Sequence, residues 1–249
     1  MAFNSDYINS IPPVTKNLLI INTLIFAVMA IAPDSKEALI ERYGALHYFG
    51  SPLFNPAQLV TYMFMHGGFT HLFFNMFALF MFGPQIEWAF GSKRFLFYYM
   101  SVGIGAGLVQ EGVYAIMIQK YAVLLSPQEY EYIISEGAKA ISQGMNFSDP
   151  TYGNLNMLVN GATVGAAGAI YGILLAFGML FPNRELMLLI PPMPIKAKWL
   201  VIGYGVLELT LGLTGRADGI AHFCHLGGMI VGLLMILYWK KKGTFHGYY

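Results

Sequence analysis

The chain has 249 residues, of which 56% are hydrophobic and only 11% charged, and its formal net charge is +1. About a quarter of the residues of a soluble domain are charged, so this composition excludes a soluble globular protein, and its many apolar residues exclude a disordered one. The balanced charge gives no basic surface for nucleic acid, and the one cysteine, Cys224, excludes a disulfide framework and a cysteine-based zinc site. The composition therefore predicts an all-α membrane protein that crosses the bilayer several times.

Six apolar stretches have the length of membrane-spanning helices. A bilayer core about 30 Å thick requires roughly 20 residues at about 1.5 Å rise each, and the absence of water there requires a helical backbone. The predicted spans cover, in chain order, residues 17–32, 57–82, 95–118, 166–181, 197–213 and 220–239. The fourth span is short, which leaves room for its start to lie below the membrane surface.

The first span also resembles a secretory signal peptide. Ala30-Ile31-Ala32 has the small residues of a cleavage site, and the apolar run before it is of signal-like length. However, only one basic residue, Lys16, precedes the run, and Pro33 directly follows the cleavage position. We therefore interpret this segment as a retained helix.

The distribution of lysine and arginine predicts the orientation, because cytoplasmic loops carry an excess of these residues. With a cytoplasmic N-terminus, nine basic residues lie on the cytoplasmic side: Lys16, Lys93, Arg94, Arg184, Lys196, Lys198, Lys240, Lys241 and Lys242. Five lie on the other side: Lys36, Arg42, Lys120, Lys139 and Arg216. We therefore expect both termini to be cytoplasmic.

The longest polar stretch, residues 119–160, separates the third and fourth spans. Ser126-Pro127-Gln128-Glu129 has the spacing of a helix-capping box, and Gly144 is suited to end the helix that follows. Four apolar residues of this helix are candidates for resting on the membrane surface: Ile133, Ile134, Ala138 and Ile141. We interpret the stretch as an extramembrane insertion into a single domain of residues 1–249, with a functional lid as the alternative.

Three groups of residues stand out within the spans, where polar side chains are functional candidates by default. They are His66, His71 and Asn75 in the second span, Gly165-Ala166-Ala167-Gly168 at the start of the fourth, and His222 and His225 in the sixth. With the N-terminus inside, these three spans all begin at the outer surface. The groups therefore lie at a similar depth, and the i, i+4 spacing of His71 and Asn75 puts both on one helix face.

Four histidines suggest a metal site, but the rest of the sequence argues against one. It has no HExxH motif, and no acidic residue lies beside these histidines to act as a further ligand. For His66 and His222 we favour hydrogen bonding between helices. The intramembrane acids Glu111 and Glu208 do not form an evident path, which disfavours a transporter. We expect neither a metal nor a cofactor.

Glycines four residues apart predict close packing between helices. The pairs are Gly103/Gly107, Gly161/Gly165, Gly168/Gly172 and Gly228/Gly232. One of them begins the fourth span, and another closely follows His225 in the sixth. Close packing of these two spans would bring residue 167 towards His225.

These residues resemble the motifs of rhomboid intramembrane serine proteases. Residues 165–168 are similar to the family's G-x-S-G motif, with Ala167 in the position of the nucleophilic serine. The other motifs are H-x-x-x-N at His71 and Asn75, G-x-x-x-E-x-x-x-G at Gly83, Glu87 and Gly91, and H-x-x-G-x-x-x-G at His225, Gly228 and Gly232. All four occur in the family's order within residues 57–239. The resemblance implies a six-transmembrane-helix rhomboid-like bundle.

The resemblance also implies catalysis by a serine–histidine dyad. A serine at position 167 would attack a peptide carbonyl, His225 would act as its general base, and Tyr171 would stack against the imidazole. Because a dyad needs no acid, we interpret Asp218, seven residues before His225, as a plain loop residue. The family's fold keeps a cavity open to the outside, with the fifth span as a movable lateral gate.

The resemblance further implies an oxyanion site at the start of the fourth span. The backbone N–H of residue 167 would hold the developing negative charge, assisted by the side chains of His71 and Asn75. The flanking glycines would support this geometry: Gly165, Gly168, Gly228 and Gly232.

The chain departs from the family pattern at two places. Members often carry Trp-Arg in the loop before the second helix, where this chain has Ala57-Gln58. More seriously, Ala167 has no nucleophilic oxygen, so the chain as written is predicted to be inactive. Either an active protease has been disarmed by a Ser→Ala substitution, or the protein is a natural inactive relative that binds membrane clients. We favour the first, because the other site residues keep the active pattern: His71, Asn75, Tyr171 and His225.

The expected substrates are transmembrane segments of other membrane proteins, because a site set among helices admits only a segment that leaves the membrane and unwinds. The short loops and the simple six-span plan favour a prokaryotic cell membrane. The expected protein is therefore an integral multi-pass membrane protease.

Overall fold

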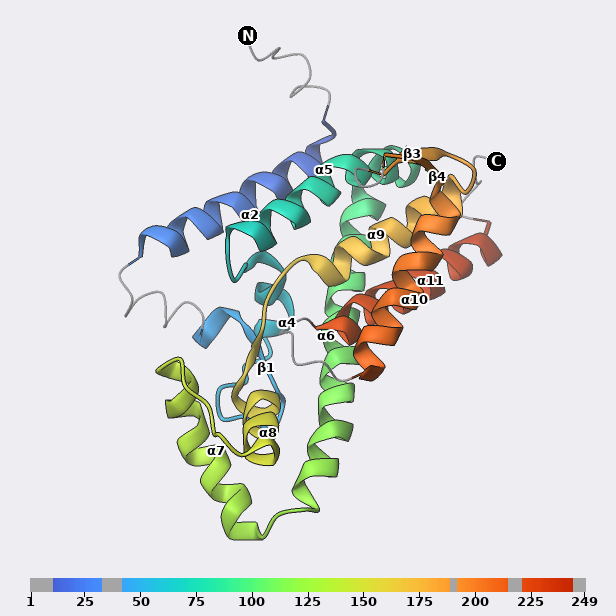
Figure 1. The fold of residues 1–249 in the computed structure, drawn as a ribbon. Helices are drawn as coiled ribbons and strands as arrows, with labels where there is room; N and C mark the ends of the chain where they lie inside the picture. Colours follow the sequence, from blue (N-terminus) through green and yellow to red (C-terminus); the bar gives the residue numbers. More distant parts are fainter. Residues whose placement is uncertain (1–10, 33–41, 189–191, 215–220, 244–249) are drawn as a thin grey trace.

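The computed structural model describes residues 11–32, 42–188, 192–214 and 221–243. It is a helical bundle in which six helices overlap the six predicted spans (Figure 1). They are α2 (Pro13–Ile31), α5 (Phe69–Phe90), α6 (Ser92–Ala122), α9 (Ala167–Leu180), α10 (Ala197–Thr214) and α11 (His222–Lys241). Four residues used in the sequence argument lie outside the described residues: Pro33, Lys36, Arg216 and Asp218.

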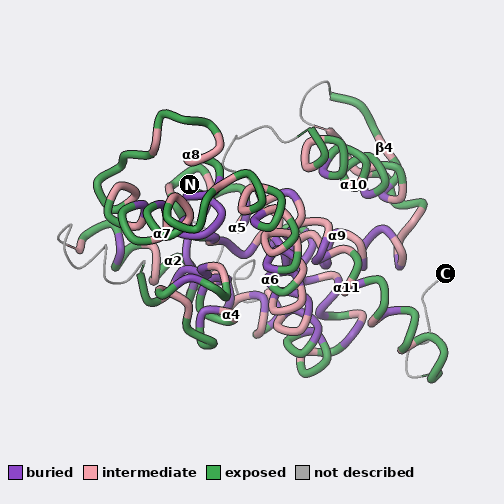
Figure 2. The backbone as a smooth tube through the Cα atoms, turned by 90° about the horizontal axis from the view of Figure 1, so that it is seen from below, coloured by how far each residue is buried: buried purple, intermediate pink, exposed green. Residues whose placement is uncertain are grey.

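Within the described residues, four helices are long and apolar enough to cross a membrane: α2, α5, α6 and α11. The α9 helix is apolar but has only 14 residues, which agrees with the short fourth span of the prediction. It lies in the middle of the bundle, packed against α5, α6, α10 and α11. Figure 2 shows its backbone mostly buried or half-buried, whereas α10 is largely exposed. The fold is thus that of a helical membrane protein with a short central helix.

The second predicted span begins too early. Residues 57–64 form the short helix α4 (Gln58–Thr61) and the 3₁₀ turn η1 (Tyr62–Phe64), and the long helix α5 begins only at Phe69. The consecutive glycines Gly67 and Gly68 separate the two, since glycine loses more backbone entropy in a helix than any other residue. At its other end α5 continues through Pro84 to Phe90. His66 therefore lies in the loop before α5, not within the span.

The loop with the Ala57-Gln58 departure is organised by Gln58, which is fully buried. Its amide nitrogen, Nε2, donates hydrogen bonds to the carbonyls of Arg42 and Leu53, at 3.1 and 2.9 Å. Its Oε1 accepts from the backbone N–H groups of His47 and Asn55. A buried amide with all these partners can fix an irregular loop, because each buried polar group must be hydrogen-bonded.

Glu87, from the G-x-x-x-E-x-x-x-G motif, joins the start of α2 to α5 and α6. Its buried carboxylate accepts hydrogen bonds from the N–H groups of Val14 and Thr15 at 3.0 and 2.7 Å. It also accepts from the hydroxyls of Thr15 and Ser92, at 2.8 and 2.7 Å. A carboxylate at a helix N-terminus satisfies free N–H groups and interacts favourably with the helix dipole. This motif is therefore structural in the fold.

Two small antiparallel strand pairs connect the helices. Strand β1 (Leu46–His47) pairs with β2 (Ala162–Thr163), which directly precedes the start of α9. Strands β3 (Glu185–Met187) and β4 (Pro194–Lys196) form the connection from α9 to α10. The first pair matters for the site, because it ties the approach to α9 to the loop that follows α2.

The polar stretch forms two helices, α7 (Pro127–Ser142) and α8 (Pro150–Asn160), beside the far end of α6 (Figure 1). The predicted capping box is present, with both reciprocal hydrogen bonds between Ser126 and Glu129. Gly144 follows the helix with a φ of +70°, as a terminating glycine does. The hydrogen bond from Tyr152, together with those from Ser126, lowers the pKa of Glu129 to about 2.

The expectation that Ile133 rests on the membrane surface is wrong. Its side chain is 0% exposed and belongs to a cluster with Ile118 of α6 and with residues of α8, namely Leu155, Leu158 and Val159. The apolar face of α7 is therefore covered by protein at Ile133, whereas Ile134, Ala138 and Ile141 are half-buried. Apolar periodicity alone does not distinguish a face that meets lipid from one that meets a neighbouring helix.

Candidate active site

The approach to α9 is held in a conformation that requires glycine. Gly165 has a φ of +123°, a region that L side chains rarely adopt, and its N–H donates to the carbonyl of Tyr62 at 2.9 Å. A Cβ at Gly165 would lie 2.7 Å from both Cε1 and Nε2 of His71. The helix then starts at Ala167, after Ala166, which provides no side-chain cap. The first N–H groups of α9 therefore have no acceptor within the helix.

The backbones of α9 and α11 come into direct contact through the predicted glycines. A Cβ at Gly228 would lie 1.9 Å from the carbonyl oxygen of Gly168, and a Cβ at Gly172 would lie 3.2 Å from the carbonyl oxygen of Gly228. Gly232 similarly approaches Gly172, with its Cβ position 3.4 Å from the Cα of Gly172. The first turns of α9 and α11 are thereby locked side by side.

His225 lies on α11 three residues before Gly228, and its ring stacks on Tyr171 of α9. The ring centroids are 4.3 Å apart and the planes differ by 6°. Ala167 lies one turn before Tyr171 on the same helix and is half-buried. The structure thus brings together the imidazole of His225, the ring of Tyr171 and the start of α9.

His71 and Asn75 come from the first turns of α5, and His71 lies next to the Gly165 backbone. The His71 ring lies against Gly165, and His66 packs edge-on against His71 with ring centroids 5.1 Å apart. Asn75 donates one hydrogen bond from Nδ2 to the carbonyl of His71 at 3.0 Å. Its amide group has two N–H bonds, so one donor remains for another acceptor.

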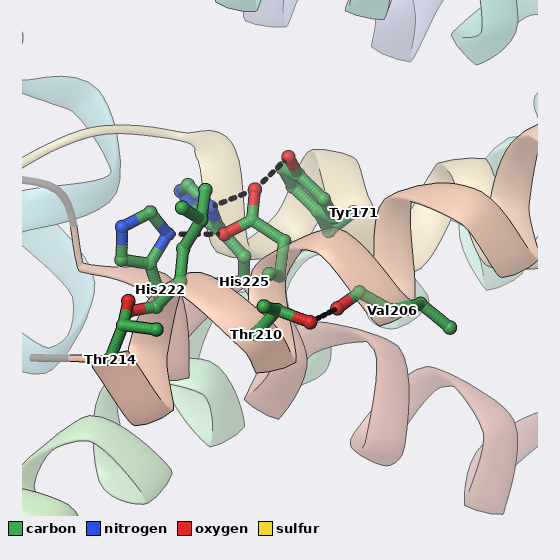
Figure 3. Close-up of polar contacts among 8 residues, drawn as sticks. Tyr171, Val206, Thr210, Thr214, His222 and His225 are labelled. Carbon is green, nitrogen blue, oxygen red and sulfur yellow. Dashed lines mark hydrogen bonds and ion pairs between the residues drawn. The ribbon is translucent and has the colours of Figure 1, made fainter.

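The acid Glu208 of α10 joins this group, through contacts to His222, His225 and Tyr171 that Figure 3 draws as dashed lines. Its Oε2 lies 2.6 Å from Nδ1 of His222, and its Oε1 accepts a hydrogen bond from the hydroxyl of Tyr171. Nδ1 of His225 lies 3.1 Å from Oε1, close enough for an ion pair but at an angle that does not make a hydrogen bond. The expectation that no acid accompanies the histidines is therefore wrong.

Closeness in the sequence did not identify this acid, because Glu208 precedes His222 and His225 by more than a dozen residues and belongs to another helix. The signal that identifies it is a carboxylate within an apolar span, which is costly unless it has partners. His222 links α11 to α10 through this carboxylate, in line with the hydrogen bonding between helices expected for it.

Glu208, His222 and His225 are also the one set of three metal-type ligands within the described residues, with all ligand atoms within 4.8 Å of one another. Zinc ligands lie about 2.0–2.2 Å from the ion, so tetrahedral N and O ligands are roughly 3.3 Å apart. The 2.6 Å between His222 and Glu208 is instead a hydrogen-bond distance. The geometry fits a hydrogen-bonded cluster better than a metal cage.

The comparisons with known proteins identify the family of the chain. The family model of the rhomboid domain matches residues 54–126 and 130–242. Rhomboid protein 1, mitochondrial, of Saccharomyces cerevisiae is 25% identical over 184 residues, which are 74% of this chain and 42% of the yeast protein. Rhomboid protease AarA of Providencia stuartii is 28% identical over 226 residues, 89% of this chain and 70% of that protein.

A shorter match is closer in sequence. The putative rhomboid protease YdcA of Bacillus subtilis is 45% identical over 47 residues, which are 19% of this chain and 24% of that protein. The chain thus spans less than half of the yeast relative but most of the Providencia relative. Because the rhomboid domain covers most of the described helices, from α4 to α11, the chain belongs to the rhomboid family.

Proposed function

We propose that the chain is an intramembrane serine endopeptidase that cleaves transmembrane segments, and that Ala167 disarms it. The observation that carries the proposal is the stacking of His225 on Tyr171, 4.3 Å between centroids, beside the N-terminus of α9 that holds position 167. Membership of the rhomboid family supports the same reading.

The proposed mechanism assigns each group a separate step. A serine at position 167 would attack a peptide carbonyl and give its proton to His225, which would later pass that proton to the leaving amine. Free N–H groups at the start of α9 would stabilise the oxyanion, together with His71 and the second N–H of Asn75. Gly165, Gly168, Gly228 and Gly232 would allow the close backbone contacts that set these groups in place.

With Ala167 the attacking oxygen is missing and no covalent intermediate can form. The same chain can still bind a substrate segment without cutting it, as a substrate-trapping protease variant does. The alternative is a natural inactive relative that binds membrane clients, and the two differ in whether a serine restores activity. The presence of the stacked His225–Tyr171 pair favours the disarmed protease, because a binding protein has no need for a base beside position 167.

The proposed substrate is a helix that unwinds at its outer end. Position 167 lies at the first turn of the most enclosed helix of the bundle, so a peptide bond reaches it only in an extended segment. We expect the Ala167→Ser variant in lipid vesicles to cut a transmembrane segment with helix-breaking residues near its outer end. It should cut a soluble unfolded chain at least tenfold more slowly. Equal rates on both substrates, measured by gel at matched concentrations, would contradict the substrate class.

The proposed topology is one domain with residues 119–160 outside, both termini in the cytoplasm and the whole protein in a prokaryotic cell membrane. The orientation is supported by the lysine and arginine count: nine lie on the side of the membrane that holds the N-terminus, and five lie on the opposite side. Cysteine introduced at Ser135, an exposed residue of α7, is expected to react with an impermeant reagent added outside cells. Cysteine at Lys242 should react only after the membrane is opened. Labelling of both from outside would overturn the orientation.

A further inference from the structure

Glu208 is a buried acidic residue on α10, a helix that is mostly exposed. Only three residues of α10 are buried, namely Ala197, Val201 and Glu208. The neighbours Val206, Leu207 and Leu209 are about half exposed, as befits a lipid-facing surface. A carboxylate that is only 5% exposed on such a helix requires compensating partners, because an unpaired charge within a bilayer is costly.

The partners of Glu208 come from two other helices and include the candidate base. Oε2 meets Nδ1 of His222 at 2.6 Å, and Oε1 accepts the hydroxyl hydrogen of Tyr171 while lying 3.1 Å from Nδ1 of His225 (Figure 3). Tyr171 also stacks on His225. The carboxylate therefore touches both the base and the residue that holds the base in plane.

The buried Nδ1 of His225 makes no hydrogen bond within the described residues, so Oε1 of Glu208 is the polar atom positioned to receive one. A neutral imidazole carries its hydrogen on either Nδ1 or Nε2, and the partner of one nitrogen selects the tautomer. A carboxylate beside Nδ1 favours hydrogen there, which leaves the lone pair on Nε2. A small rotation of the ring or carboxylate completes the bond.

We propose that Glu208 is a positioning residue for His225, selecting the tautomer whose Nε2 can act as a base and stabilising the imidazolium formed during the reaction. This rests on the proposed protease function, and Glu208 itself does not touch the substrate. During attack the serine hydroxyl gives its proton to Nε2, while the hydrogen on Nδ1 stays with His225 and Glu208 remains a carboxylate. The reacting pair thus remains position 167 and His225, and Glu208 orients the base.

The first test uses the chain as it exists, with Ala167, and needs no activity. Histidine-¹⁵N-labelled protein in lipid nanodiscs reports the tautomer of each ring through its nitrogen chemical shifts. In the unsubstituted chain at a pH where the ring is neutral, His225 is expected to carry its hydrogen on Nδ1. A predominant Nε2–H form would overturn the proposal without any variant being made.

The same spectra then compare two isosteric variants. Glu208→Gln removes the charge and should convert His225 to a mixture of tautomers. Glu111→Gln removes another buried intramembrane carboxylate. Glu111 accepts from the N–H of Phe49 at 2.9 Å and makes no hydrogen bond or ion pair with His225 within the described residues, so this variant should leave the His225 signal unchanged. An unchanged tautomer in a folded Glu208→Gln protein would contradict the assignment.

The second test adds both substitutions to the Ala167→Ser variant and follows cleavage of a transmembrane substrate. Glu208→Gln should lower kcat roughly 10- to 100-fold with KM changed less than about threefold, and Glu208→Asp should recover part of the loss. Glu111→Gln should have no such effect on kcat. An unchanged kcat for Glu208→Gln would overturn the positioning role while leaving the protease function intact.

The two tests separate the two claims. If the Ala167→Ser variant has no activity at all, the proposed function fails, and the tautomer measured in the Ala167 chain still decides whether Glu208 positions His225. If cleavage occurs but Glu208→Gln changes neither the His225 tautomer nor kcat, the positioning role of Glu208 is contradicted and the protease function stands.

Discussion

Replacing Ala167 by serine is expected to turn the inert chain into a serine protease, and adding His225→Ala to that variant is expected to abolish the activity. The hydroxyl would be created at the first residue of α9, one turn before Tyr171 and its stacked partner His225. Loss of a nucleophile or of its base typically lowers kcat by a factor of about 10³ or more, so the contrast between the two variants should be unambiguous. Ala167 is only half-buried, and the added oxygen should leave the fold intact.

Two measurements check this expectation independently. One follows cleavage of a transmembrane segment in reconstituted vesicles, and the other follows covalent labelling by a fluorophosphonate, which reports an activated serine without any substrate. Both signals should appear only when Ser at position 167 and His225 are present together. A folded Ala167→Ser protein that is inert to the probe and to several substrates would favour the inactive, client-binding relative.

Most of the fold followed from apolar run length, because a helix inside a bilayer satisfies its own backbone and needs no tertiary information to be located. All the predicted spans except the second agree with their helices, α2, α6, α9, α10 and α11, to within four residues at each end. The predicted start of the second span was wrong, because residues 57–64 are apolar enough to be counted with it. Gly67 and Gly68 separate these residues from α5, and hydropathy averaged over a window of residues does not reveal such a break.

The site was predictable where its residues repeat at helical spacing and less so where they meet from different helices. The glycines around residue 167 and His225 indicate close packing through their own i, i+4 pattern, and the structure brings Gly168 and Gly228 into contact. Glu208 shows no such pattern, because its role depends on which face of α10 turns inward. The same limit explains Ile133, whose neighbours on α8 are distant in the chain.

Gly228→Ala is expected to be the most damaging single-methyl change in the bundle, because it would separate α9 from α11. The new Cβ would lie 1.9 Å from the carbonyl oxygen of Gly168, which is backbone and cannot rotate away. The helices must move apart, with a loss of stability of about 1–3 kcal/mol for an overpacked contact. In the Ala167→Ser background the shift also displaces His225 from position 167, and a misplacement of about 1 Å lowers the rate roughly 100-fold.

The matched control is Gly203→Ala on α10, since a Cβ at Gly203 meets nothing within 4 Å. Alanine is the better helix former by about 0.5–1 kcal/mol, so this variant should keep full activity and unfold no earlier than its parent. Thermal unfolding in detergent and cleavage rates in vesicles are compared for both variants. If Gly228→Ala matches Gly203→Ala in both measurements, a methyl group fits between α9 and α11, and the two backbones are not in direct contact at the site.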